Sequence, residues 1–120
     1  MAKAIRVEKV SSEIERTLSL ILQHDVHDSR VAENFGSITR IELTNDLKYA
    51  RVYVSVFGDE DDRKRFMEGL ASAKGFIRSE LGKQTTLRYV PELQFKLDRS
   101  FEEGSKVISL LEQMRAEGKL

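Results

Sequence analysis

The spacing of hydrophobic residues predicts a helix at the start of the chain, over residues 5–24. The apolar positions recur at steps of three and four: Val7, Val10, Ile14, Leu18, Ile21 and Leu22. This spacing places them on one side of an α-helix, which would pack on a core. Residues 24–34 are polar and have no periodicity, so we expect a loop there.

Two segments that alternate between apolar and polar residues then predict a β-hairpin. Residues 35–44 form the first, with Ile41 and Leu43 directed inward, and residues 47–57 form the second. In the second, one face would carry Ala50, Val52, Val54 and Val56, and the other Tyr49, Arg51, Tyr53 and Ser55. A period of two is typical of a strand with one buried face. The polar pair Asn45-Asp46 predicts the connecting turn.

A second long helix is predicted after Gly58. The acidic run at residues 59–62 suits the positive end of a helix dipole. One apolar stripe then follows: Phe66, Leu70, Ala73, Ile77 and Leu81. Small residues and a glycine at 71–75 predict a kink near Ala73–Gly75, and Gly82 is a candidate C-terminal cap.

A third strand and a last helix complete the predicted order. Apolar residues recur at odd-numbered positions and would share one face of a strand: Leu87, Tyr89, Leu93, Phe95 and Leu97. Pro91 has no amide hydrogen, so this strand should be at a sheet edge or bulged at the proline. A capping box from Ser100 to Glu103 predicts a final helix, with Val107, Ile108, Leu111 and Met114 inward. The order predicts an α+β fold: a three-stranded sheet with helices on one face and the other face open.

Composition narrows the class of protein. A chain of 120 residues predicts a single domain over residues 1–120. It has 20 basic and 20 acidic residues, and this balance argues mildly against a nucleic-acid binder while leaving local basic patches possible. It has no cysteine, which excludes disulfides and thiolate zinc sites. Without a membrane-length apolar run or a signal peptide, we expect a soluble cytoplasmic protein.

Five segments, in this order along the chain, resemble the bacterial ribosome-binding factor A family. They are residues 28–31, 45–56, 75–82, 87–95 and 98–100. The resemblance implies a type II KH-like domain with a mixed three-stranded sheet, in which Ala73-Lys74-Gly75 at a helix kink replaces the Gly-x-x-Gly loop. It further implies a factor that binds the free small (30S) ribosomal subunit. Such a factor assists late maturation and 5′ processing of 16S rRNA, including in the cold.

The candidate RNA-binding residues form three groups, each with a plainer alternative. At the kink, Ala73 and Gly75 would let an RNA backbone approach, and Lys74, Arg78 and Lys83 would contact phosphates. The alternative is a glycine tolerated where two helical segments pack tightly. On the first helix, Lys3, Arg6, Lys9 and Arg16 would track phosphates, or they form only a solvated face. Arg30 either caps the loop beside Asp28 or reaches RNA.

The open sheet face is a further candidate. Its exposed positions would include Arg40, Tyr49, Arg51, Tyr53, Arg88 and Lys96. Aromatic side chains interleaved with cations can stack bases. Cross-strand tyrosine and arginine pairs also stabilise exposed sheets, and this structural interpretation is favoured. Arg88 is kept among the RNA-binding candidates.

Catalysis and metal binding have little support in the sequence. His24, Asp25, His27 and Asp28 have a spacing that could hold a metal, but a helix-end loop is the commoner explanation. The sequence contains no phosphate-binding glycine loop and no catalytic triad in a motif context. We therefore expect a non-enzyme without metal or cofactor, a monomer whose partners are the 30S subunit and 16S rRNA, with no membrane and no small-molecule substrate. The alternative is a protein-interaction module, such as a homodimer formed through a sheet edge and the C-terminal helix.

Overall fold

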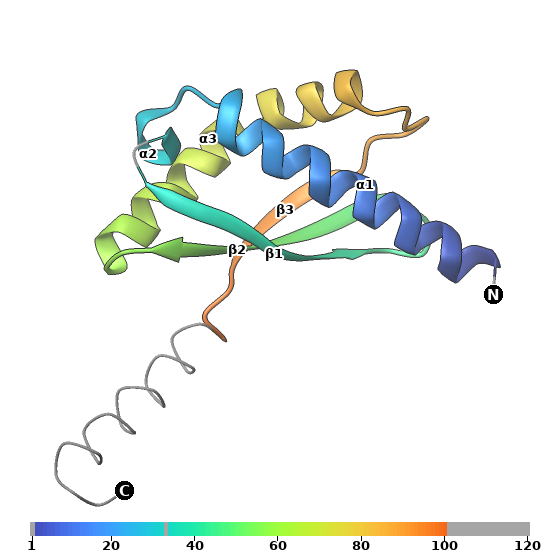
Figure 1. Cartoon of the computed structure of the whole chain (residues 1–120), viewed down its shortest axis with the longest axis horizontal. Coiled ribbons are helices and arrows are strands. Elements are labelled where there is room, and N and C mark those ends of the chain that lie inside the picture. Colours follow the sequence, from blue (N-terminus) through green and yellow to red (C-terminus); the bar gives the residue numbers. More distant parts are fainter. Residues whose placement is uncertain (1, 33, 101–120) are drawn as a thin grey trace, which may run out of the picture.

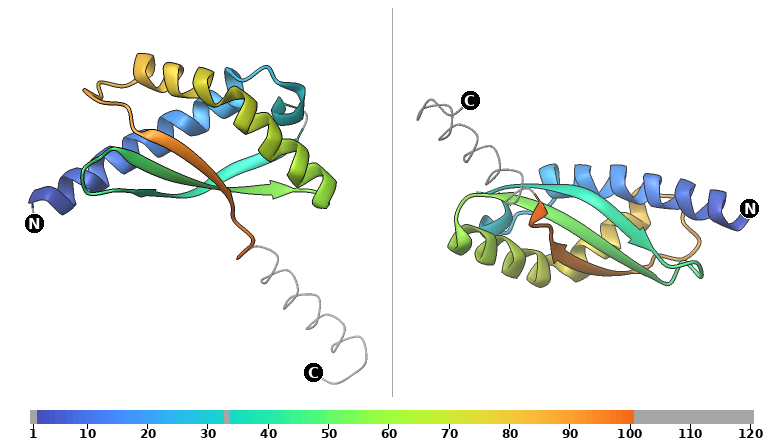
Figure 2. Two further views of the ribbon diagram at one scale, coloured as in Figure 1. Left: turned by 180° about the vertical axis from the view of Figure 1, so that it is seen from behind. Right: turned by 90° about the horizontal axis from the view of Figure 1, so that it is seen from below.

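The computed structural model describes residues 2–32 and 34–100, apart from the side chains of residues 2–4 and 35. The elements follow in the order α1 (Ala2–His24), α2 (Ser29–Ala32), β1 (Phe35–Leu43), β2 (Tyr49–Phe57), α3 (Glu60–Gln84) and β3 (Glu92–Leu97). The helices α1 and α3 cross the same face of the sheet (Figure 1). Seen from below, no described helix lies in front of the strands (Figure 2). The helix predicted from Ser100 onward falls outside the described residues.

The sheet is mixed, with strand order β1-β2-β3. β1 and β2 form the predicted antiparallel hairpin, in which Ile41 pairs with Val52. β3 lies parallel to β2, and Phe95 pairs with the same Val52. The chain reaches β3 through α3, as a parallel pair requires a crossover connection. The predicted α+β class is confirmed, and within residues 2–32 and 34–100 one face of the sheet is open (Figure 2).

The core lies between the sheet and the two long helices. The inward residues of β2, namely Ala50, Val52, Val54 and Val56, are at most 3% exposed. Both predicted helical stripes meet them with fully buried side chains: Ile14, Leu18 and Ile21 from α1, and Phe66, Leu70, Ile77 and Leu81 from α3. Ala73 of the second stripe is partly buried against the same core. Periodicity therefore identified the core faces correctly.

β1 contains a bulge that simple alternation did not predict. The pairing register shifts between Ile38 and Arg40, so Thr39 is the extra residue. As a result Ile38 lies opposite Val54 and packs against the core, together with Ile41 and Leu43. Two apolar residues three positions apart thus share one face of a strand.

Three predicted details differ from the structure, and the predicted helix kink takes the form of a bend. The segment expected to be a loop contains α2, whose Val31 is buried. Helix α3 remains continuous through Ala73–Gly75, and the kink is a change in the direction of its axis rather than a break (Figures 1 and 2). Its C-terminal cap is Thr85, not Gly82. The third strand begins only at Glu92, so Tyr89 is 64% exposed instead of facing the core.

The start of α3 is fixed by two aspartates. The Asp59 carboxylate accepts a hydrogen bond from the Asp62 amide at 2.8 Å, and the Asp62 carboxylate accepts one from the Asp59 amide at 3.0 Å. This reciprocal pair is a capping box. The acidic run at residues 59–62 is therefore explained by helix capping and the dipole.

Candidate nucleic-acid interface

A groove lies between the second half of α3 and the loop formed by residues 85–91. We name it the α3 groove; its volume is about 530 Å³ and it is lined by Gly75, Arg78, Ser79, Gly82, Arg88, Tyr89 and Val90. At Gly75 a Cβ atom would meet nothing within 4 Å. The backbone of α3 is therefore open to close approach at that residue. The groove unites three predicted site residues: Gly75, Arg78 and Arg88.

Arg78 fixes one wall of the α3 groove. Its Nε atom donates a hydrogen bond to the carbonyl oxygen of Pro91 at 3.2 Å, and its Nη2 atom donates one to the carbonyl oxygen of Val90 at 2.8 Å. These bonds hold the 85–91 loop against α3. Because Arg78 is exposed, it also brings a positive charge to the rim of the groove.

The other predicted residues of α3 point in different directions. Ala73 faces the core, and Lys74 is partly buried and does not line the α3 groove. The ammonium group of Lys83 lies 3.5 Å from the Glu80 carboxylate, and its side chain is 69% exposed. Of the Ala73-Lys74-Gly75 segment, only Gly75 contributes to the groove.

Arg30 makes an internal contact. Its Nε and Nη2 atoms donate to the two carboxylate oxygens of Asp28 at 3.0 and 2.7 Å, and Nη2 also donates to the Ser72 hydroxyl at 3.0 Å. The hydrogen bonds from the Arg30 side chain, and then from its backbone, lower the pKa of Asp28. Of the two alternatives for Arg30, the structure shows the one within the protein, which joins α2 to α3.

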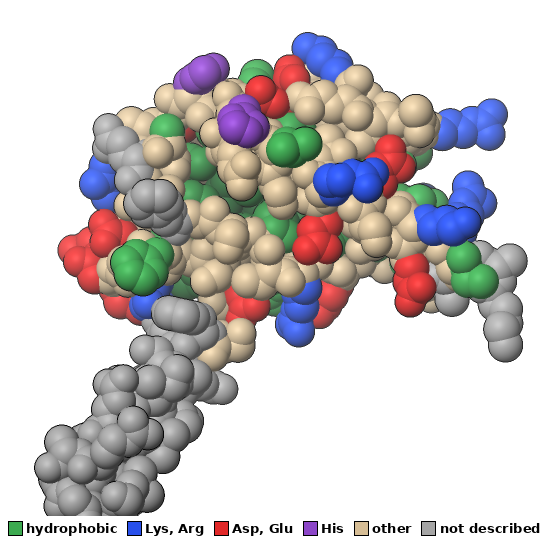
Figure 3. Space-filling model, viewed as in Figure 1, with side chains coloured by type: hydrophobic (Ala, Val, Ile, Leu, Met, Phe, Trp, Pro, Cys, Tyr) green, Lys and Arg blue, Asp and Glu red, His purple; other side chains and the backbone are tan. Residues whose placement is uncertain are grey.

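The cations of α1 separate into two kinds. Arg6 is exposed and lines a second pocket on the far side of the 85–91 loop, together with Lys48 and Arg88. Lys9 is exposed on the same helix but lines no pocket described in this part of the chain. The side chain of Lys3 is outside the described set. Blue side chains gather at this end of the molecule, at the right of Figure 3.

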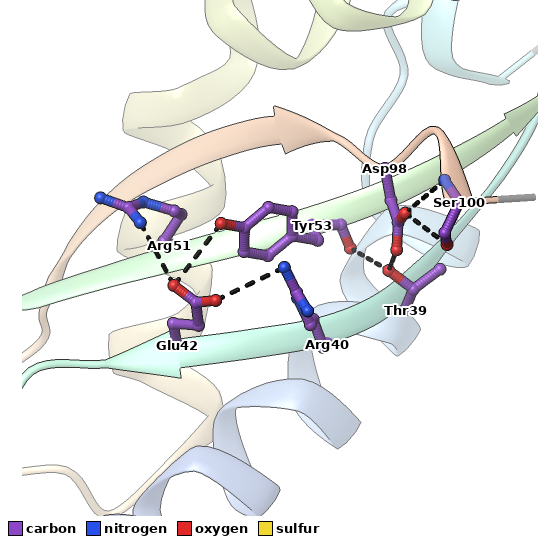
Figure 4. Close-up of polar contacts among 7 residues, drawn as sticks. All are labelled: Thr39, Arg40, Glu42, Arg51, Tyr53, Asp98 and Ser100. Carbon is purple, nitrogen blue, oxygen red and sulfur yellow. Dashed lines mark hydrogen bonds and ion pairs between the residues drawn. The ribbon is translucent and has the colours of Figure 1, made fainter.

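The open sheet face carries cations that are already matched by a carboxylate. Glu42 accepts hydrogen bonds from Arg51 at 3.2 Å and from the Tyr53 hydroxyl at 3.5 Å, and it lies 3.5 Å from Arg40 (Figure 4). The guanidinium carbon of Arg40 lies 4.1 Å from the centre of the Tyr53 ring, a cation–π contact. This network supports the structural interpretation of the face.

Within residues 2–32 and 34–100, no group of three or more His, Cys, Asp or Glu side chains could hold a metal ion. Asp28 of the suspected His/Asp cluster binds Arg30, and Asp25 accepts a hydrogen bond from Gln84 at 2.8 Å. None of the described helices is long and apolar enough to cross a membrane.

Comparison with known proteins identifies the family. The sequence model described as Ribosome-binding factor A matches residues 6–111. The chain belongs to the ribosome-binding factor A family. A relative with this description from Syntrophomonas wolfei is 48% identical over 114 residues, which cover 95% of this chain and 93% of the relative.

Solved structures agree with the assigned fold. The solution structure of a Thermotoga maritima protein, proposed to be a ribosome binding factor A, is 37% identical with a TM-score of 0.69 and covers 81% of this chain and 91% of that one. A homology model of the Thermus thermophilus factor, fitted into a cryo-EM map of its complex with 30S, has a TM-score of 0.61. It is 22% identical and covers 76% of this chain and 93% of that one. At that identity it supports the fold alone.

Two residues of the interface were missed from the sequence. Tyr89 was assigned to the core by its parity, and Lys48 was not singled out. The signal for Tyr89 is Pro91: a proline cannot donate to a strand ladder, so the strand can begin after it and the residues before it need not belong to the strand. No local signal marks Lys48, because its neighbours at the pocket come from distant segments.

Proposed function

We propose that this protein is a ribosome assembly factor that binds the small (30S) ribosomal subunit and contacts 16S rRNA through the α3 groove. The observation that carries the proposal is the open backbone at Gly75, beside Arg78 and Arg88 in one groove. Family membership and the α+β element order support it.

The groove suits recognition of RNA by its backbone and by stacking. A helix surface without a side chain lets a phosphate approach, while Arg78 and Arg88 supply positive charge. Tyr89 offers an exposed ring on which a base can stack. With a net charge of zero, the protein would hold free RNA only modestly, and binding should weaken as salt rises.

The finer parts of the proposal rest on the family. The factor would act in the cytoplasm as a monomer, late in 30S maturation, and would assist 5′ processing of 16S rRNA and growth in the cold. It would do so without catalysis, by holding RNA in one arrangement. The alternative, a homodimer formed through a sheet edge and the C-terminal helix, stays a prediction, because that helix lies outside the described residues.

The test is co-sedimentation with free 30S subunits over a salt series. Gly75→Glu places a carboxylate in the α3 groove, and we expect it to weaken binding about tenfold or more. Gly75→Ala is the control for the fold, and Arg65→Gln makes the same change in net charge on the same helix about 15 Å away. The α3 groove would be excluded as the RNA-binding site if Gly75→Glu, with an unchanged melting temperature, bound 30S subunits as well as Arg65→Gln does.

A further inference from the structure

A second pocket lies behind the 85–91 loop, and we name it the end pocket. Its walls are Arg6 and Val10 of α1, Leu47 and Lys48 of the β1–β2 turn, and Leu87 to Tyr89 of the loop. Its volume is about 500 Å³, within the range of ligand sites. The three wall segments lie far apart in the sequence.

The rim of the end pocket is positively charged. The side chains of Arg6, Lys48 and Arg88 make no ion pair or hydrogen bond with any other described residue. The one acid at the pocket, Asp46, is used in the turn: it accepts hydrogen bonds from the Thr44 hydroxyl at 2.7 Å and from the Lys48 amide at 3.1 Å. Three cations against one carboxylate leave the rim with a net positive charge, which favours an anionic ligand.

The interior of the end pocket is apolar and aromatic. Val10 and Leu87 are partly buried against the core, and the Tyr89 ring stands exposed at the edge. A phosphate on the rim with a planar base against tyrosine is the arrangement by which proteins hold single-stranded RNA. The positive rim and the apolar, aromatic interior of the end pocket together suit the phosphate and the base of a nucleotide.

Leu47 lines the end pocket from the β1–β2 turn, where its amide donates a hydrogen bond to the carbonyl oxygen of Thr44 at 2.9 Å. Its φ angle is +64°, and it is the one non-glycine residue of the described chain with a positive φ. This conformation costs a leucine about 1–2 kcal/mol, and glycine or asparagine would adopt it more easily. Backbone strain of this kind clusters at ligand sites. The turn that holds Leu47 in this conformation also places it in the wall of the end pocket.

We propose that the end pocket binds a nucleotide of single-stranded RNA, and that one RNA strand passes from the α3 groove over Tyr89 into it. Arg88 and Tyr89 line both cavities, so the 85–91 loop divides a continuous path. This inference rests on the proposed function and extends its RNA contact to α1 and the β1–β2 turn.

The direct test uses fluorescence. The chain has no tryptophan, so Tyr89→Trp would carry the single indole of the protein. The probes are oligoadenylate of about ten nucleotides and the tetranucleotide, since one clamp of this type holds about four. We expect the longer RNA to quench the indole and to bind at least fivefold more tightly than the tetranucleotide. A poly-glutamate peptide that quenches and competes equally would overturn the proposal in favour of an acidic protein segment.

Matched variants separate the end pocket from the α3 groove. Arg6→Glu and Lys48→Glu, on two different elements, should weaken binding of the longer RNA about tenfold and leave the tetranucleotide unaffected. Lys9→Glu changes the same charge on the same helix as Arg6 and should have a much smaller effect. Equal effects of Arg6→Glu and Lys9→Glu would indicate a diffuse basic ridge and overturn the end pocket.

The two proposals fail in different ways. Gly75→Glu should weaken both RNA lengths, because it acts in the α3 groove. If Gly75→Glu has no effect while Arg6→Glu does, the α3 groove is not an RNA site and the continuous path is overturned, while RNA binding at the end pocket is retained. If only Gly75→Glu has an effect, the proposed function stands and the end pocket is wrong.

Discussion

The hydroxyl of Thr39 donates a hydrogen bond to a carboxylate oxygen of Asp98 at 2.6 Å. Thr39 is the bulged residue of β1, and Asp98 directly follows β3, so the bond links the two outer strands across β2. The other oxygen of Asp98 accepts from the amide and the hydroxyl of Ser100 at 2.9 and 2.6 Å (Figure 4). The bulged residue Thr39 is therefore stabilised by a side chain beyond β3, which the alternation of apolar and polar residues in β1 does not predict.

Thr39→Val should lower the free energy of unfolding by about 1 kcal/mol, the usual net value of a hydrogen bond, because the Thr39–Asp98 bond is exposed to solvent. Urea denaturation measures the change. In a double-mutant cycle with Asp98→Ala, which removes both acceptor oxygens, the two losses should be less than additive, because both variants lack the Thr39–Asp98 bond. Full additivity would mean that the contact contributes nothing.

The pH dependence of stability should report on Asp98. Hydrogen bonds from Ser100 first, and then from Thr39, lower its pKa from 3.8 to about 2. Because the folded pKa lies below the unfolded one, the stabilisation is complete above about pH 4 and is lost as the pH falls toward 2. Glu60, whose pKa Arg99 and Arg63 also lower to about 2, loses its contribution in the same range.

For this reason the measurement is the difference between the wild type and Asp98→Asn. The gap between their urea midpoints should be widest near neutral pH and should narrow below about pH 4. A gap that stays constant down to about pH 2 would contradict the assigned bonds.

Two glycines of α3 should respond to alanine in opposite directions. At Gly75 a Cβ meets open space, so Gly75→Ala should raise stability by up to about 1 kcal/mol through helix propensity. At Gly69 a Cβ would lie 2.8 Å from Val31, so Gly69→Ala should lower stability by about 1–3 kcal/mol through overpacking against α2. Thermal melting of the pair checks this, and a destabilised Gly75→Ala would show that the helix surface there is covered.

Arg78→Lys should lower stability by about 1 kcal/mol, because lysine keeps the charge but cannot donate to both the Val90 and Pro91 carbonyls. Amide exchange in the 85–91 loop should become faster. Arg65→Lys is the control: it makes the same substitution at an exposed position of the same helix and should change stability by no more than about 0.5 kcal/mol. Equal losses of stability at both positions would contradict the proposal that Arg78 holds the 85–91 loop against α3.

The core was predictable because it depends on local repeats. The steps of three and four in α1 and the alternation of Val52 and Val54 in β2 need no knowledge of the rest of the chain. The bulge was not, since Thr39 is stabilised by Asp98, 59 residues away. The prediction that Tyr89 faces the core was wrong for a related reason. Its position fits the alternation of the third strand, but that strand begins only after Pro91.

The candidate interface was predictable only in part. The resemblance to the family pointed to Gly75 and its neighbours, and the structure places Gly75, Arg78 and Arg88 around one groove. The bond from Arg78 to the loop and the union of Arg6, Lys48 and Arg88 at the end pocket depend on tertiary packing. No periodicity within one segment encodes a contact between three segments.

The parallel pairing of β3 with β2 sets an order for vectorial folding. The β1–β2 hairpin and α1 can form contacts as soon as residue 57 has been synthesised, whereas the sheet stays incomplete until residue 97 is available. Until then the central strand is an edge that another chain can extend, so a nascent or truncated chain ending near residue 91 should aggregate. We expect the pairing of β3 with β2 to be the step that protects the chain from aggregation.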